Sequence, residues 1–128
     1  MRSKLKSRFG HWLMPVEIKT ADYTITPADF GKTFTNRGDG GAIVFTLPAV
    51  TTAFSGCWVR FFIVADQDFT IASTADEMIA FNDVDANAIA FTTNSEQVGS
   101  SVLMLCDGTS WLAIVNLGAE TATPTVTT

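Results

Sequence analysis

Hydrophobic and polar residues alternate with a period of two along much of this 128-residue chain, most clearly at residues 57–65. One side of that stretch carries only Cys57, Val59, Phe61, Ile63 and Ala65, whereas the other carries Trp58, Arg60, Phe62 and Val64. Side chains of a β-strand point alternately to its two faces. We therefore expect a central strand that is buried fully on one face and largely on the other, with the remaining strands arranged to cover it.

Shorter stretches of the same kind follow one another at intervals of about ten residues, separated by turn residues. The expected strands lie at residues 23–26, 33–35, 42–47, 69–72, 78–81, 88–92, 101–106 and 110–115. Asp107-Gly108 predicts a hairpin between the last two, and 69–72 is expected to pair back as a hairpin. No segment of the body has a sustained helical period. We expect an all-β fold: a small antiparallel β-sandwich or barrel of about eight or nine strands with an extended N-terminal arm.

The chain has one domain's worth of residues. Its predicted parts are a basic N-terminal arm at 1–20, a β domain at 21–117 and a Thr-rich C-terminal tail at 118–128. Loops are expected at the glycine-rich residues 36–41 and the polar residues 82–87. The tail contains Pro124 and lacks apolar alternation, so we expect it to need a neighbour to become ordered.

The composition favours contact with other protein surfaces. Charged residues make up only 16% of the chain, and ten Phe and three Trp are present. Charged residues usually account for about a quarter of a globular protein. The pattern therefore favours a protein that buries surface against copies of itself or another protein. The alternative is a monomer whose surface consists of Thr, Ser and Asn.

The net charge of −5 is divided unevenly. Residues 1–16 contain four bases and no acid, whereas residues 17–128 contain four bases and all thirteen acids and so carry −9. A basic arm therefore precedes an acidic body, which indicates that the arm contacts something negatively charged. Binding of nucleic acid is not expected, because four clustered bases are few and the acidic body would repel phosphate.

The arm combines its bases with apolar residues at helical spacing. Leu5, Phe9, Trp12 and Leu13 stand at positions i, i+4, i+7 and i+8, and the bases among them are Arg2, Lys4, Lys6 and Arg8. A short helix of this kind could lie on an anionic membrane surface or in a groove of an acidic protein, and a disordered tail is the alternative. Pro15 would limit any helix to the residues before it. We expect an arm that docks on a partner.

No membrane span, secretory signal or disulfide is expected. The apolar run at 57–65 is interrupted by Arg60 and is shorter than the ~20 residues that a span requires. Gly10-His11 interrupts the apolar part of the arm, whereas a secretory signal needs a continuous apolar core. Cys57 and Cys106 lie in separate strands without metal-site spacing. A disulfide would require those strands to be neighbours, and we expect free buried thiols in a protein made in the cytoplasm.

Two loops contain fragments of known ligand motifs. Residues 37–39 read Arg-Gly-Asp, a cell-adhesion tripeptide in other settings, but the glycines that follow explain this loop through turn chemistry. Asp83, Asp85 and Asn87 begin like a calcium loop, although Ala88 stands where that loop needs glycine and Asn94 where it needs a bidentate glutamate. We expect solvated loops, with no metal ion and no cofactor.

No set of residues indicates a reaction. His11 is the only histidine and lies in the arm, so neither a Ser-His-Asp triad nor a histidine-metal site is indicated. Carboxylates such as Asp76 and Glu77 could meet another acid in space, as in glycosidases, but any acidic body offers such pairs. We therefore expect no catalytic residues and a protein that is not an enzyme.

Three fragments together resemble a module of tailed-bacteriophage virion proteins. They are residues 21–36 (ADYTITPADFGKTFTN), 43–48 (IVFTLP) and 99–111 (GSSVLMLCDGTSW). Their order over about residues 21–116 is more distinctive than any one of them. Tyr23 and Ile25 are expected to point inward, and Trp111 to cover the edge of the core. Asp29 is expected to bond the backbone of the turn that Gly31 completes.

The module occurs in small capsid decoration (cement) proteins and in pieces of tail fibres. The resemblance implies a structural protein on the exterior of a virion capsid, made in the host cytoplasm, which binds the major capsid protein as a homotrimer and stabilises the shell by bridging capsomers. The arm lies outside the resemblance and would add capsid contacts.

Trp58, Arg60 and Phe62 are the candidate subunit interface, with the Thr-rich tail as another candidate. The alternative function is a tail-fibre or head-fibre module that binds a host receptor or glycan. Because the chain starts with Met1 and ends soon after the module, we expect the free-standing decoration protein.

Overall fold

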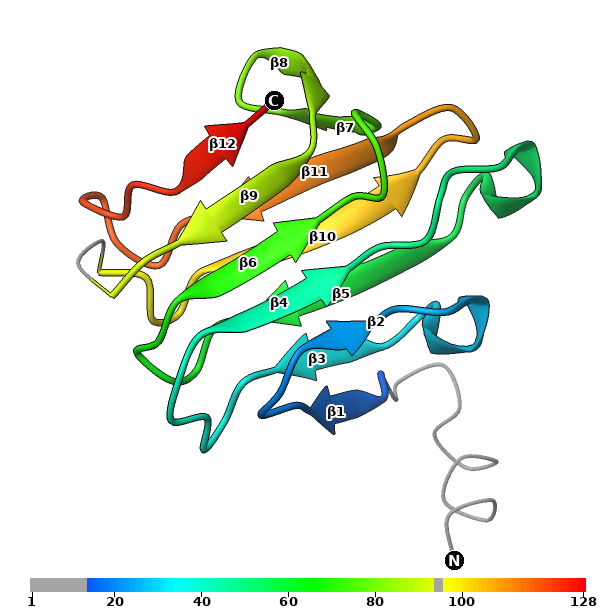
Figure 1. Ribbon diagram of the computed structural model, residues 1–128. Coiled ribbons are helices and arrows are strands. Elements are labelled where there is room, and N and C mark those ends of the chain that lie inside the picture. Colours follow the sequence, from blue (N-terminus) through cyan, green and yellow to red (C-terminus); the bar gives the residue numbers. More distant parts are fainter. Residues whose placement is uncertain (1–13, 94–95) are drawn as a thin grey trace, which may run out of the picture.

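The computed structural model describes residues 14–93 and 96–128, which form a sandwich of two β-sheets (Figure 1). The strand order is β1-β3-β5-β10-β11-β7-β8 in the seven-stranded sheet and β12-β9-β6-β4-β2 in the five-stranded sheet. The strands are β1 (Val16–Ile18), β2 (Tyr23–Thr24), β3 (Thr33–Thr35), β4 (Ile43–Thr46), β5 (Trp58–Phe62), β6 (Phe69–Ala72), β7 (Met78–Ala80), β8 (Asp83–Ala86), β9 (Ala88–Phe91), β10 (Ser101–Cys106), β11 (Trp111–Asn116) and β12 (Thr125–Thr127). Two short 3-10 helices, η1 (Pro27–Asp29) and η2 (Thr52–Phe54), lie in the connections.

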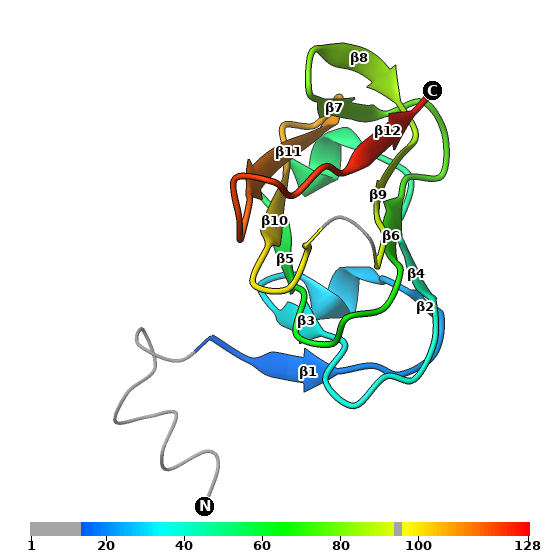
Figure 2. The same cartoon turned by 90° about the vertical axis from the view of Figure 1, so that its left-hand side faces the viewer.

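The all-β sandwich predicted from the sequence is confirmed. Seen edge-on in Figure 2, β5, β10 and β11 form one layer, and β4, β6 and β9 form the other. The described residues contain twelve strands, more than predicted, because several have only two to four residues. The sheets are mixed rather than antiparallel, since β1-β3, β3-β5, β2-β4, β4-β6 and β7-β11 are parallel pairs.

The core lies between the two sheets and is rich in aromatic rings. The predicted inward face is confirmed for Val59, Phe61 and Ile63, which are fully buried, but Cys57 and Ala65 at the ends of the predicted stretch lie outside β5 and are half-buried. Phe61 belongs to a cluster with Phe34, Phe45 and Phe69 in which the contacting ring centroids lie 5.1–6.3 Å apart. Tilted and edge-on pairs at such distances are favourable beyond the area that they bury. These rings join the two layers.

The predicted hairpin at Asp107-Gly108 is confirmed. β10 and β11 pair antiparallel in register, from Ser101 opposite Asn116 to Cys106 opposite Trp111. Asp107 Oδ1 accepts hydrogen bonds from the backbone N–H groups of Thr109 and Ser110, at 2.9 and 2.7 Å. Trp111 is fully buried, as predicted, and its Nε1 donates to Pro48 O at 3.0 Å.

The predicted hairpin between β5 and residues 69–72 is wrong. β6 lies in the opposite sheet, where it pairs in parallel with β4 and antiparallel with β9. The buried carboxamide of Asn36 explains the crossing. Its Oδ1 accepts from the N–H groups of Val64 and Ala65, at 2.8 and 2.9 Å, and its Nδ2 donates to Ala65 O at 3.1 Å. The backbone groups of Val64 and Ala65 therefore bond Asn36 and are not free to pair with a strand that returns beside β5. The chain bends toward the other layer instead.

The strands extend further along the chain than predicted. Part of the expected loop at 82–87 is β8, which pairs with β7 through a turn formed by Phe81 and Asn82, both with positive φ. Two such residues in succession make the turn that suits a tight hairpin. β1 lies within the predicted arm and β12 within the predicted tail, so the sandwich continues past residues 21–117 at both ends. The tail is ordered by β9 of its own chain.

Candidate interaction site

The N-terminal arm joins the body at the outer side of the seven-stranded sheet. Its predicted capsid-binding residues lie outside the described residues, namely Arg2, Lys4, Leu5, Lys6, Arg8, Phe9, Trp12 and Leu13. Met14 is the first residue that the structure describes. It is exposed, and its Sδ accepts a hydrogen bond from Nη2 of Arg60 at 3.2 Å. The position from which the arm starts is therefore known relative to β5.

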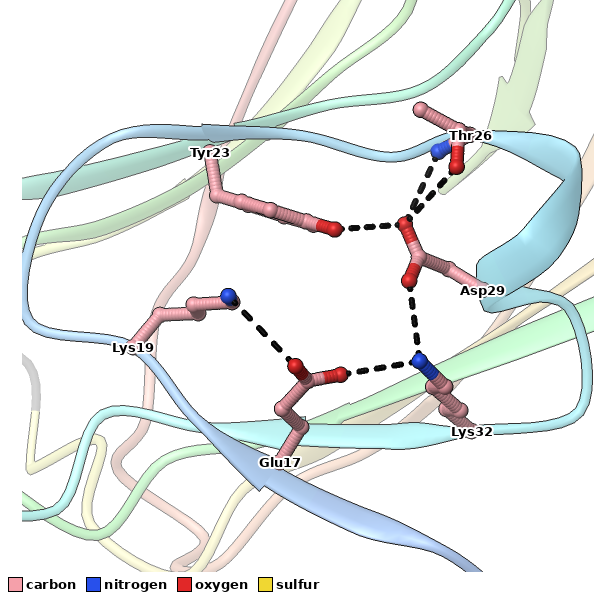
Figure 3. A network of polar contacts seen from close by, with 6 residues as sticks. All are labelled: Glu17, Lys19, Tyr23, Thr26, Asp29 and Lys32. Atoms are coloured by element: carbon pink, nitrogen blue, oxygen red, sulfur yellow. Dashed lines mark hydrogen bonds and ion pairs between the residues drawn. The ribbon is translucent and has the colours of Figure 1, made fainter.

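A chain of polar contacts fastens β1 to the body (Figure 3). Glu17, in the middle of β1, lies between two lysines, with Oε1 3.5 Å from Lys19 Nζ and Oε2 3.1 Å from Lys32 Nζ. Lys32 also reaches Oδ1 of Asp29, at 3.2 Å. The ammonium of Lys19 lies 4.0 Å from the ring centroid of Tyr23, a cation–π contact. Together these contacts tie β1 to η1 and to the start of β3.

Asp29 is the buried centre of this network and is only 2% exposed. Its Oδ2 accepts hydrogen bonds from the Tyr23 hydroxyl at 2.8 Å and from Thr26 N at 3.0 Å. Burial by itself would raise the pKa of Asp29, but the donors from Thr26, Tyr23 and Lys32 outweigh it and the pKa is lowered. Acceptance by Asp29 in turn raises the pKa of the Tyr23 hydroxyl. The predicted bond from Asp29 to the turn is confirmed, and Gly31 follows with a positive φ.

This network is suited to holding structure rather than to chemistry. Each carboxylate oxygen of Glu17 and Asp29 already has a partner within the molecule. A general base or a metal ligand needs an oxygen that can face a substrate or an ion. The network therefore fixes the root of the arm.

The side of the seven-stranded sheet that faces away from the core is here called the outer face. Its side chains stand in three rows set by the strand register. The rows are Val16-Thr33-Arg60-Leu103-Ile114, Ile18-Thr35-Phe62-Ser101-Asn116 and Trp58-Leu105-Leu112-Ile79. Most of these residues are apolar, and Arg60 is the one charged residue among them. A hollow of about 200 Å³ on this face is lined by Met14, Trp58, Arg60, Leu103 and Leu105.

The predicted interface residues Trp58, Arg60 and Phe62 all lie on the outer face. The expectation that this side of β5 is largely buried is wrong for Phe62, which is 41% exposed, while Trp58 and Arg60 are half-buried. Within residues 14–93 and 96–128, no second layer covers this side of the sheet, because the other sheet packs on the opposite side. The sequence pattern does not identify the remaining apolar positions, although residues 102–106 are apolar in both phases of the period-two pattern, which indicates a strand with two apolar faces.

The Arg-Gly-Asp tripeptide is not presented as a ligand. Arg37 is exposed, but Asp39 is only 8% exposed and its Oδ1 accepts a hydrogen bond from Gly41 N at 3.2 Å. Gly38 has a φ of +78°, which identifies the segment as a turn. An adhesion motif would have to expose its carboxylate, and this one is turned into the protein.

The residues of the calcium-like fragment are used within the chain. Asp83 Oδ1 accepts from Asp85 N at 2.9 Å, and its Oδ2 accepts from the Thr128 hydroxyl. These bonds lower the pKa of Asp83, the bond from Thr128 most of all. Asn87 Oδ1 accepts from the Thr127 hydroxyl at 2.8 Å. The side chains of Asp83 and Asn87 thus help to hold β12 at the edge of the sheet.

The carboxylates of Asp76 and Glu77 also have partners within the chain. Asn87 Nδ2 donates to Asp76 Oδ1 at 3.4 Å, and Val50 N lies 3.3 Å from each oxygen of Glu77. Across residues 14–93 and 96–128, no three acidic, histidine or cysteine side chains gather as metal ligands would.

Cys57 and Cys106 are both free: Cys57 directly precedes β5 and Cys106 ends the neighbouring strand β10. The expectation of two buried thiols is confirmed for Cys106 and wrong for Cys57, which is half-buried. Cys106 N donates to Cys57 O at 2.9 Å across the β5-β10 pair. Cys106 is buried, and this burial raises the pKa of its thiol. A raised pKa keeps the thiol protonated and makes it a poor nucleophile.

A second hollow, of about 360 Å³, opens at one end of the sandwich. It is lined by Asp66, Thr93, Glu96, Gln97 and Val98. Glycan-binding grooves usually present aromatic rings on which sugars can stack, and none lines this hollow. Trp111 is fully buried, and Trp58 lies in the hollow of the outer face.

Comparisons with known proteins do not place the chain in a family. No protein-family model matches it, and a search of curated proteins finds no match. Within the described part of the chain, no helix has the length and apolar character needed to cross a membrane. The fold and the geometry of the outer face are therefore the basis for a functional proposal.

Proposed function

We propose that this protein is a structural, non-catalytic component of a phage virion. It binds the outside of the capsid as a homotrimer and stabilises the shell by bridging capsomers. The observation that carries the proposal is that basic and large apolar residues are concentrated in the N-terminal arm, whereas the acidic residues are confined to the body. Four bases and four large apolar residues precede Met14, whereas all thirteen acids lie in the body.

The body supplies a rigid unit from which the arm can reach a partner. The polar network of Glu17, Lys32 and Asp29 holds β1 against β3, so the arm starts from a fixed point. Because the body is acidic and the arm basic, an acidic capsid surface would attract the arm and repel the body. Phe9, Trp12 and Leu13 would be the apolar anchors, and Arg2, Lys4, Lys6 and Arg8 the steering contacts.

The residues of the phage-like fragments have structural roles, which suits a building block. Asp29 caps η1, and Trp111 closes the core by donating to Pro48 O. Stabilisation of the shell would follow from mass action, because each bound copy adds contacts that exist only in the assembled particle.

A capsid-pelleting experiment tests the proposal. Full-length protein should co-sediment with purified capsids and raise the temperature at which they break open, and a variant lacking residues 1–13 should do neither. Replacing Arg2, Lys4, Lys6 and Arg8 with Gln should slow association and weaken its dependence on salt. Replacing Phe9 and Trp12 with Ser should mainly speed dissociation. If the full-length and truncated proteins occupy capsids equally, the arm does not contribute to capsid binding.

A tail-fibre or head-fibre module that binds a host receptor or glycan is the second candidate. One observation favours it, since Trp58 lies half-buried beside the open hollow of the outer face and offers a ring to a sugar. This function requires that the purified protein bind host cells and that Trp58→Ala abolish the binding. Cell binding without capsid binding would favour this candidate over the first.

A further inference from the structure

The outer face carries several large apolar side chains that the described part of the chain leaves exposed. Val16 is 64% exposed, Ile18 and Ile114 are each 53% exposed, and Phe62 is 41% exposed. They come from strands far apart in the sequence, and the register brings them onto one surface. Phe62, Leu103 and Ile114 come from the neighbouring strands β5, β10 and β11, whereas Thr33 and Thr35 of β3 stand between them and the two β1 residues. A group of neighbouring apolar side chains marks an interaction site more often than isolated exposed residues do.

The charge on this face distinguishes it from the rest of the body. None of the thirteen acids occupies a position in its three rows. The single cation is held by its own chain, because Arg60 Nε donates to Thr33 Oγ1 at 3.2 Å and Nη2 donates to Met14 Sδ. Two copies of an acidic body repel one another wherever carboxylates would meet. The outer face is a surface on which copies can meet without that repulsion.

The flat area of the face is smaller than a typical specific interface. The six strands that form it span about 24 Å at ~4.8 Å per neighbour, and its longest strands measure about 20 Å. A specific interface buries about 800 Å² on each partner. The flat area is roughly half to two-thirds of that figure, and side chains that stand up from the sheet add to the area that a partner can cover.

We propose that the outer face of the seven-stranded sheet is the surface through which copies of this chain associate. This inference rests on the proposed function and deepens it, because it identifies the contact that makes the protein an oligomer. The other candidate seam, the Thr-rich tail, already pairs with β9 of its own chain. Leu103, Phe62 and Ile114 are the apolar centre of the contact, and Met14 lines the same hollow as Leu103.

Sedimentation equilibrium of the full-length protein over a dilution series tests the proposal. The wild type should sediment as a trimer, at three times the chain mass of 13.8 kDa. Ile114→Lys and Phe62→Lys should each raise the dissociation constant at least about tenfold, because each buries an unpaired charge at the contact. Val98→Lys is the matched control, since Val98 is 49% exposed but lies beside the other hollow, and it should leave the dissociation constant unchanged. Near-ultraviolet circular dichroism of the buried Trp111 confirms that each variant is folded.

Three results would overturn the proposal. One is a wild type that remains monomeric over the whole series, and another is an Ile114→Lys variant with wild-type mass. The third is association that appears only after residues 1–13 are deleted, because those residues would then cover the face. Capsid pelleting separates the capsid-binding function from association through the outer face. A monomeric Ile114→Lys variant that still pellets with capsids supports both proposals. A wild-type oligomer that never pellets contradicts only the capsid-binding function.

Discussion

Two buried polar residues determine how the sandwich is closed near the root of the arm. Asp29 gathers donors from Tyr23, Thr26 and Lys32, and Asn36 bonds the backbone at Val64 and Ala65. Buried polar groups that have all their hydrogen-bond partners favour one particular fold, because removal of one partner leaves the others unsatisfied. Both residues therefore contribute more to the fold than their exposed neighbours.

Replacing Asp29 with Asn should lower the free energy of unfolding by about 1–3 kcal/mol at neutral pH, because a charged acceptor for three donors is lost. The pKa of Asp29 is lowered from its usual value of 3.8, so its contribution is complete above that value and is lost as the pH falls through the folded-state pKa. As the pH falls from 7 to below the pKa of Asp29, the free energy of unfolding should therefore decrease less for the Asn variant than for the wild type. Urea unfolding followed by Trp fluorescence measures this, with the exposed Asp85→Asn as control. Identical pH profiles for wild type and Asp29→Asn would contradict the role of the network.

Replacing Asn36 with Ala should cost about 2–4 kcal/mol, because two backbone N–H groups and one carbonyl lose a buried partner. Chemical denaturation measures the loss, and hydrogen exchange at Val64 and Ala65 should accelerate. Asn36→Asp keeps the acceptor for both N–H groups and loses the bond to Ala65 O, so it should preserve their protection better than Ala does. Slow exchange at both amides in the Ala variant would show that another group satisfies them.

At the scale of elements, the segment that enters β10 and the segment that leaves β11 are in close backbone contact. A Cβ on Gly118 would lie 2.7 Å from the backbone atoms Gly99 C, Ser100 N and Val98 O. Gly118 N also donates to Ser100 Oγ at 2.8 Å. Only glycine lets the chain that leaves β11 pass so near the loop that enters β10.

Gly118→Ala should therefore destabilise the protein by about 1–3 kcal/mol, because a backbone cannot move aside as a side chain can. Gly40→Ala is the control, since a Cβ there meets nothing within 4 Å, and it should change stability by less than about 0.5 kcal/mol. Thermal unfolding of both variants measures the difference. Equal melting temperatures would mean that the two segments are not held in contact.

Local patterns in the sequence were sufficient for some elements and not for others. Alternation and turn residues predicted β5, β10 and β11 with their hairpin, because these depend on neighbours in the chain. The direction of β6 depends on Asn36, twenty-eight residues before the Val64 N–H that it bonds, and a polar residue in a loop does not reveal its partner. β1, β8 and β12 have three or four residues each and form by pairing with β3, β7 and β9, and their own short sequences do not reveal these partners.

The candidate site was predicted in part for the same reason. Trp58, Arg60 and Phe62 were identified because they share one phase of a long alternating strand. Val16, Ile18, Leu103 and Ile114 join them only through strand pairing across the sheet. The extent of the outer face is thus a property of the topology, which periodicity within a single strand does not specify.

For the whole molecule, the separation of charge is the feature that a capsid-binding role would use. The acidic body keeps copies apart except at the outer face, and the basic arm is attracted to acidic surfaces. Added salt should weaken the arm's contribution more than the apolar contact between copies, because exposed charges are screened and apolar burial is not. Pelleting with capsids in rising salt should therefore release the oligomer before it dissociates, and sedimentation of the released protein would show its mass.

The location of the protein in a reconstruction of the phage particle tests the account most directly. The account predicts density for the β-sandwich on the outside of the head, with residues 1–13 in contact with the major capsid protein. Copies should meet through the outer faces of their seven-stranded sheets. Density for the protein only at the tail, or its absence from the particle, would contradict the account.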